Sequence, residues 1–185
     1  MRPDRPPEGE PRRLFEGETE TELNPAVQER ARGVGLVMRR PQWSPNTELV
    51  HEATVYAKEK GRDGEFHHVA AAAYWETGAD LSNMDTLKEL AEKSGLNWAE
   101  LSPLLKSHRH RDTVFQEYEG AKALGVTGTP AYMIGGELLK GDVSLEELQR
   151  AVEKAAKGSL GVFVLPQSTL TTQKGDNLGG TPLRG

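Results

Sequence analysis

The sequence of 185 residues contains no cysteine, so it offers neither a disulfide nor a thiolate. Every step of dithiol–disulfide exchange passes through a mixed disulfide, which requires a thiol in the protein or one bound to it. The polypeptide by itself is therefore excluded from this chemistry. The absence does not identify a compartment, because a chain without cysteine suits a reducing cytosol and an oxidising exterior equally.

Long hydrophobic runs and an excess of basic residues are also missing. No stretch approaches the roughly 20 apolar residues of a transmembrane helix, and the Arg- and Pro-rich start of the chain lacks the apolar centre of a secretory signal. With 23 basic and 28 acidic residues, the chain carries a net charge of -5, which argues against a broad phosphate-binding surface. We therefore expect a cytoplasmic protein that binds no nucleic acid and no membrane.

The composition predicts one folded domain between two polar ends. Residues 1–22 are rich in Pro, Arg and Glu, and we expect an extended lead-in that is too polar to bury. Residues 23–158 carry the apolar periodicities of the domain, with helices over about 44–124 and a turn, a hairpin and a last helix over 125–158. Residues 159–185 are expected to form a mobile tail.

Capping signals predict where the helices begin. Asn24-Pro25 and Asn83 each provide an N-cap, and Ser44–Thr47 opens another helix. Asn97 also resembles a cap, but Pro103 inside a helix begun there would cost about 3 kcal/mol. We therefore expect a single turn that ends near Leu101, followed by a new helix from Ser102.

The segment Gly125–Gly136 closes a helix, passes through an X-Pro bond and enters a short apolar strand. The strand candidates Ala131–Ile134 and Leu138–Leu139 flank Gly135-Gly136, which predicts a β-hairpin with a two-residue turn. Ser144 and Glu147 form a capping box for the last helix. Its predicted apolar face consists of Leu145, Leu148, Val152 and Ala155.

The run Gly125-Val126-Thr127-Gly128-Thr129-Pro130 resembles the cis-proline loop of the DsbA-like thioredoxin-fold family, which includes FrnE-type oxidoreductases and 2-hydroxychromene-2-carboxylate isomerases. Gly35–Met38, Ser44–Thr47 and Asp80–Ser82 match the family in the same order. The resemblance implies an α/β, thioredoxin-like fold with an all-helical insertion. The family's first strand and Cys-x-x-Cys segment are not found, so we expect an incomplete N-terminal βαβ unit and favour truncation over a genuine cysteine-free relative.

At the family level the resemblance implies a thiol–disulfide oxidoreductase, with this chain predicted inactive in dithiol exchange by itself. One alternative is a glutathione-dependent isomerase or transferase, in which the thiol belongs to the cofactor. Another is a non-catalytic peptide-binding module. The expected partners are a peptide or thiol substrate or glutathione, which is also the one cofactor considered, and no catalytic residue is assigned.

Three residues are predicted to bind substrate. The resemblance implies a cis Thr129–Pro130 bond that presents the Thr129 backbone to an extended peptide or to glutathione. We expect this loop to face a groove between the hairpin and the helical insertion. Asn46 lies at a helix start, where capping is its commonest use, although the isomerase branch has the matching Asn near its glutathione pocket.

No metal site is predicted. Adjacent histidines on a helix point about 100° apart, so His67 and His68 do not readily share one ion. Neither this pair nor the cluster of His108 and His110 has a cysteine or a nearby carboxylate in sequence to complete a site. His51 is interpreted as a packed or surface residue and not as a general base.

The missing first strand has a consequence for the hairpin. The resemblance places that strand beside Ala131–Ile134, so we expect backbone groups there without their usual neighbour. We expect the chain either to recruit a strand, from Val162–Leu165 or from a second copy as a homodimer through the sheet edge, or to be marginally stable and prone to aggregate.

Overall fold

The computed structural model describes residues 5–158, which lie in two compact units divided after Leu124. This division coincides with the end of the helical insertion drawn from the sequence. None of the helices in residues 5–158 is both long and apolar enough to span a membrane.

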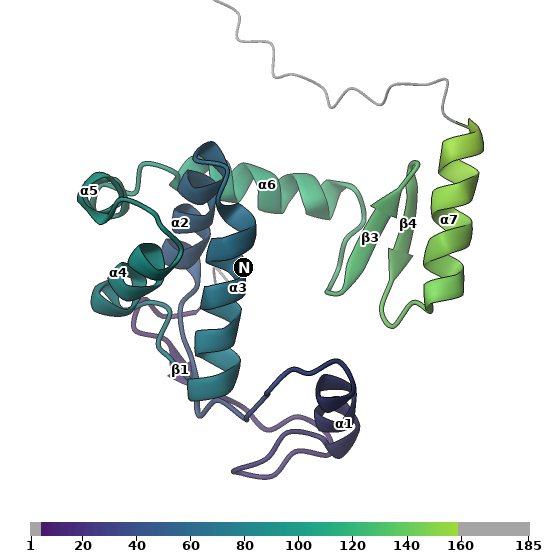
Figure 1. The fold of residues 1–185 in the computed structure, drawn as a ribbon, viewed down its shortest axis with the longest axis horizontal. Helices are drawn as coiled ribbons and strands as arrows, with labels where there is room; N and C mark the ends of the chain where they lie inside the picture. The colour runs from purple at the N-terminus through teal and green to yellow at the C-terminus, as the bar shows by residue number, and fades with distance from the viewer. Residues whose placement is uncertain (1–4, 159–185) are drawn as a thin grey trace, which may run out of the picture. The chain divides into compact units, whose positions relative to one another are not determined.

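The first unit consists mainly of helices (Figure 1). Its elements are β1 (Glu10–Pro11), α1 (Pro25–Gly33), β2 (Trp43–Ser44), α2 (Glu48–Glu59), α3 (Asp63–Ala72), the π-helical turn η1 (Ala73–Thr77), α4 (Met84–Lys93), α5 (Trp98–Lys106) and α6 (Arg111–Ala123). The predicted caps are confirmed, since Asn24 Oδ1 accepts from the Ala26 N–H and Asn83 Oδ1 from the Asp85 N–H.

Helix α2 is central to the core of the first unit. It packs against α3, α5 and α6, while α4 packs against α3 and α5. The largest fully buried apolar side chains are Phe66 of α3, Leu87 of α4, and Leu101 and Leu105 of α5. Burying such side chains contributes roughly 1.5–3 kcal/mol each, so the helices are held by their shared apolar stripe.

The segment before α1 is held against the rest of the first unit by polar contacts. Strand β1 pairs antiparallel with β2, with Glu10 opposite Ser44. The side chains of Glu18 and Arg40 are 6% and 2% exposed, and Glu18 Oε2 lies 2.6 Å from Arg12 Nη1. Most of residues 5–22 are exposed, and Glu18 is an exception to the expectation that this segment is too polar to bury, because charge-assisted hydrogen bonds compensate its charge.

Helix α5 runs without interruption through Pro103, so the predicted break near Leu101 is also wrong. Asn97 caps the helix by accepting from the Ala99 N–H at 3.0 Å. Leu101 and Leu105 are 0% and 1% exposed, and only a continuous helix keeps both on the same buried face. This burial outweighs the missing hydrogen bond at Pro103.

The second unit contains β3 (Ala131–Ile134), β4 (Glu137–Lys140) and α7 (Leu145–Gly158). The hairpin is as predicted: Ile134 pairs with Glu137 around a turn in which Gly135 and Gly136 have φ of 57° and 85°. The capping box also forms, because Glu147 Oε2 accepts from the Ser144 N–H at 2.9 Å.

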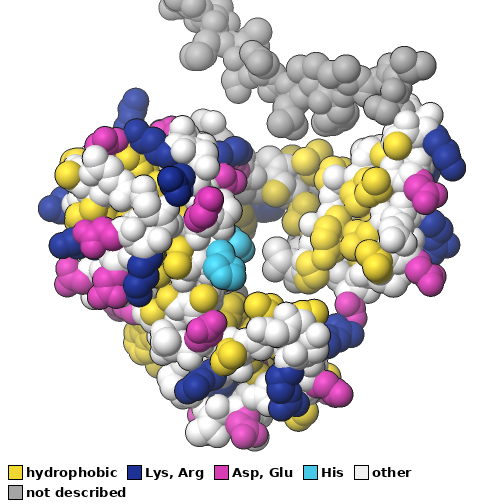
Figure 2. Space-filling model, in the orientation of Figure 1, with side chains coloured by type: hydrophobic (Ala, Val, Ile, Leu, Met, Phe, Trp, Pro, Cys, Tyr) yellow, Lys and Arg dark blue, Asp and Glu magenta, His cyan; other side chains and the backbone are white. Residues whose placement is uncertain are grey.

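The apolar face of α7 is only partly covered. Ala151 is buried, whereas Leu145 and Val152 are 69% and 55% exposed. Tyr132 and Met133 of β3 are exposed as well, and Figure 2 shows hydrophobic side chains gathered on this unit. The hairpin and one helix therefore leave apolar surface accessible to a further element or partner.

Pro103→Ala is expected to stabilise the protein by about 1–3 kcal/mol. The substitution restores a donor for the Ala99 carbonyl, and the Pro103 side chain is exposed, so little packing is lost. Urea unfolding followed by tryptophan fluorescence measures the change. A lower midpoint for the variant would show that the proline fits α5 without a penalty.

Stability is also expected to depend on the protonation of His51 in α2. Burial, together with the nearby charge of His67, lowers the pKa of His51 to about 4 from 6.5. The folded state thus resists a proton that the unfolded state accepts, so this contribution is complete above pH 6.5 and is lost as the pH falls through 4. Between these limits the wild type should lose about 1–3 kcal/mol more than His51→Gln. Urea titrations at pH 7 and pH 4 measure the free energy of unfolding of both proteins. If the wild type and His51→Gln lose the same free energy between these pH values, the expectation is wrong.

Candidate functional site

The predicted substrate loop lies at the start of the second unit. Gly125 has φ of 85° just after α6 ends, and the residues from Thr127 to Pro130 are exposed. The Thr129–Pro130 peptide bond is cis, the isomer that the sequence analysis predicts. The Pro130 carbonyl accepts from the Gly141 N–H at 2.9 Å, so the loop leads directly into the hairpin ladder.

Among residues 5–158, β4 is the only strand that pairs with β3. Hydrogen-bonded and non-hydrogen-bonded pairs alternate in an antiparallel ladder. The Pro130–Gly141 bond and the register place the backbone groups of Ala131 and Met133 on the outer side. The expected missing neighbour stays a prediction, and Val162–Leu165, the proposed substitute strand, lies outside the described residues.

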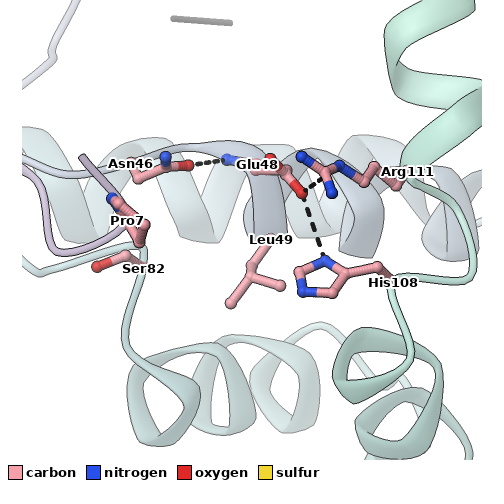
Figure 3. Close-up of a pocket in the computed structure, with 7 residues that line it drawn as sticks. All are labelled: Pro7, Asn46, Glu48, Leu49, Ser82, His108 and Arg111. Carbon is pink, nitrogen blue, oxygen red and sulfur yellow. Dashed lines mark hydrogen bonds and ion pairs between the residues drawn. The ribbon is translucent and has the colours of Figure 1, made fainter. Parts of the chain in front are cut away.

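A pocket of about 370 Å³ lies in the first unit, at the beginning of α2 (Figure 3). Its walls come from the N-terminal segment, the loop before α4, helix α2, and the turn between α5 and α6. The lining residues are Pro7, Asn46, Glu48, Leu49, Ser82, His108 and Arg111.

Asn46 lines this pocket, but its amide is already engaged. Its Oδ1 accepts from the Glu48 N–H at 2.8 Å, and its Nδ2 donates to the Arg5 carbonyl at 3.2 Å. The side chain thus fixes the first turn of α2 and ties the N-terminal segment to it. Thr129 and Pro130 belong to the second unit, so each candidate site is described within its own unit.

Two glutamates of α2 converge on one histidine beside the pocket. Glu48 and Glu52 are four residues apart, which places them on one helix face. His108 Nδ1 lies 2.8 Å from Glu52 Oε1 and 3.4 Å from Glu48 Oε1. The fully buried Glu52 also accepts from the His110 N–H at 3.1 Å, and Arg111 Nε lies 3.1 Å from Glu48 Oε1.

The turn after α5 places His108 against α2. His108 has φ of 51°, the only positive value at a non-glycine position in residues 5–158. Its N–H donates to the Leu105 carbonyl at 3.1 Å, so it reverses the chain where a helix commonly ends in the left-handed conformation. That conformation costs roughly 1–2 kcal/mol for a residue with a Cβ. The hydrogen bond to Glu52 offsets part of this cost.

These contacts correct one premise of the sequence analysis. No carboxylate was found to accompany His108 and His110, yet the structure brings Glu48 and Glu52 to His108 across more than fifty residues. The available signal was the i, i+4 pair of glutamates at the start of a predicted helix. Nothing in the local sequence connected that pair to the histidines.

One family model matches most of the chain. Residues 18–153 match the family model described as the DSBA-like thioredoxin domain. An uncharacterized Bacillus subtilis protein, YwbO, is 24% identical over 135 residues, which cover 71% of this chain and 68% of that protein.

The fold has a counterpart among solved structures. The crystal structure of a probable DsbA oxidoreductase from Streptomyces coelicolor matches with a TM-score of 0.68 at 23% identity, over 84% of this chain and 68% of that one. The predicted α/β, thioredoxin-like fold with its all-helical insertion is thereby confirmed. The family match spans both units and most of the chain, and the protein therefore belongs to the DsbA-like thioredoxin-domain family.

Proposed function

We propose that this family member binds an extended polypeptide segment along the Thr129–Pro130 loop and the outer edge of β3, and does not itself carry out thiol–disulfide exchange. The observation that carries the proposal is the pair of outward-facing backbone positions, Ala131 and Met133, directly after the exposed loop. An added strand forms main-chain hydrogen bonds with such an edge, whatever its own sequence.

The side chains beside this edge suit a broad range of peptide sequences. Tyr132 and Met133 alternate along β3 and are 37% and 44% exposed. An aromatic ring offers a large contact area, and the flexible thioether of methionine adapts to different neighbours. Main-chain pairing would then provide affinity, and these two side chains would favour apolar residues in the bound segment.

Peptide binding and thiol–disulfide exchange have different chemical requirements, and the composition of this chain meets only those of peptide binding. Exchange requires a thiolate on the enzyme or on a bound cofactor, and the 185 residues contain no cysteine. Holding a peptide requires only the loop and the strand edge. The family's substrate-binding half can therefore act in this chain without its redox chemistry.

A glutathione-dependent isomerase or transferase is the alternative, because glutathione would bring its own thiol. Asn46, the residue predicted for that cofactor, already uses both ends of its amide within the first unit. A second copy of the chain could also pair with the β3 edge and form a homodimer, and it would then compete with a peptide for this edge. Dependence of the assembly on protein concentration distinguishes a dimer from peptide binding.

Met133→Pro should weaken peptide binding at least about tenfold, because proline removes the edge-facing N–H while leaving the β3–β4 ladder intact. Met133→Ala is the matched control, since it keeps the N–H and loses only side-chain contacts. The probe is fluorescein-labelled lysozyme that has been reduced and S-alkylated, titrated with the full chain and followed by anisotropy. Equal affinities of both variants and the wild type would overturn the proposal.

Reduction of insulin by dithiothreitol should proceed at its uncatalysed rate in the presence of the protein. Saturable acceleration with dithiothreitol as the only thiol would contradict the proposal that the protein does not take part in thiol exchange. The same assay with glutathione as the thiol tests the alternative. A saturable rate above that of free glutathione would favour the isomerase or transferase.

A further inference from the structure

We propose that Glu48, Glu52 and His108 bind one divalent transition-metal ion at the edge of the pocket in the first unit. Each residue offers one ligand atom, and these atoms all lie within 4.8 Å of one another. The proposal concerns the first unit alone and does not rest on the peptide-binding proposal.

The two distances measured from His108 Nδ1 fit a shared ion. Metal–nitrogen and metal–oxygen bonds of roughly 2.0–2.2 Å, at angles between 90° and 110°, separate two ligand atoms by about 2.8–3.6 Å. His108 Nδ1 lies 2.8 Å from Glu52 Oε1 and 3.4 Å from Glu48 Oε1. The two carboxylates approach the same ring nitrogen, and Figure 3 shows Glu48 directed at that nitrogen.

A single proton on His108 Nδ1 satisfies the two glutamates less completely than a metal ion would. A hydrogen on His108 Nδ1 can point directly at only one of the two glutamate oxygens. A metal ion at the convergence point would replace this proton and contact all three atoms. His108 would then coordinate through Nδ1 and keep its proton on Nε2.

The charge balance also favours a cation. Glu52 is entirely buried, and its contacts are the imidazole of His108 and the His110 N–H. Arg111 is directed at Glu48 instead, with Nε 3.1 Å from Oε1. With a neutral imidazole, two glutamates and one arginine leave a net negative charge, part of it on the buried carboxylate of Glu52, where charge is costly without a cation nearby.

Arg111 competes with the ion for the carboxylate of Glu48. Its side chain is 53% exposed, so it can move into solvent when a metal takes its place beside Glu48. The pocket of about 370 Å³ lies on the same side and leaves room for water at the remaining coordination positions. Two carboxylates and one imidazole suit Zn²⁺, Mn²⁺ or Fe²⁺, and the affinity for zinc should exceed that for manganese.

The test is isothermal titration of the metal-free full chain with Zn²⁺. We expect one ion per chain, with affinity reduced at least about tenfold in Glu48→Gln and in His108→Asn. Asparagine tolerates the left-handed backbone of this position, so the second variant should fold. Glu117→Gln and His68→Asn remove an exposed carboxylate and an exposed imidazole elsewhere in the first unit, and both should bind like the wild type.

Arg111→Gln tests the site most specifically, because removing the competing cation should tighten Zn²⁺ binding about twofold or more.

Histidine ring signals in NMR provide a second measurement: Zn²⁺ should shift the signals of the His108 ring and leave those of His67 and His68 in place. Absence of stoichiometric binding would overturn the proposal. Binding that is unchanged in both Glu48→Gln and His108→Asn would overturn it equally.

Discussion

The buried carboxylate of Glu52 links the central helix of the first unit to the chain that follows α5. Its two oxygens accept from His108 Nδ1 and from the His110 N–H, both in the turn before α6. A carboxylate removed from water without such partners costs several kcal/mol, so the turn must stay against α2 as long as Glu52 is charged. The positive φ of His108 is one result of this requirement.

The same interaction explains why the pocket exists where it does. Helix α2 contacts α3, α5 and α6, and its first turn is held by Asn46, whose amide also binds the N-terminal segment. The turn carrying His108 then closes one side of the space and the loop carrying Ser82 another. Polar contacts therefore shape the pocket, whereas the apolar stripe of α2 only fixes which helices surround it.

Local signals in the sequence predicted most of the secondary structure. Asn24, Asn83 and Ser144 cap helices as expected, because a cap depends on residues no more than three positions away. The hairpin around Gly135-Gly136 was predictable for the same reason, since both residues adopt the positive φ that its turn requires.

The wrong predictions concern features that depend on contacts between residues far apart in the sequence. Pro103 stays inside α5 because Leu101 and Leu105 are both needed in a core that other helices complete. Glu18 is buried because Arg40, twenty-two positions later, and Arg12 compensate its charge. The Glu52–His108 contact spans still more of the chain, so no window of sequence could reveal it.

The absence of cysteine affects metal chemistry as well as redox chemistry. Thiolate is the softest ligand that a protein side chain offers, and it draws zinc and copper away from oxygen and nitrogen sites. In this chain no thiolate competes with the carboxylates and imidazoles. A histidine whose Nδ1 is already aimed at two glutamates, one of them buried, needs little rearrangement to accept an ion. Within these 185 residues the Glu–His cluster therefore has no softer side-chain competitor for a divalent ion.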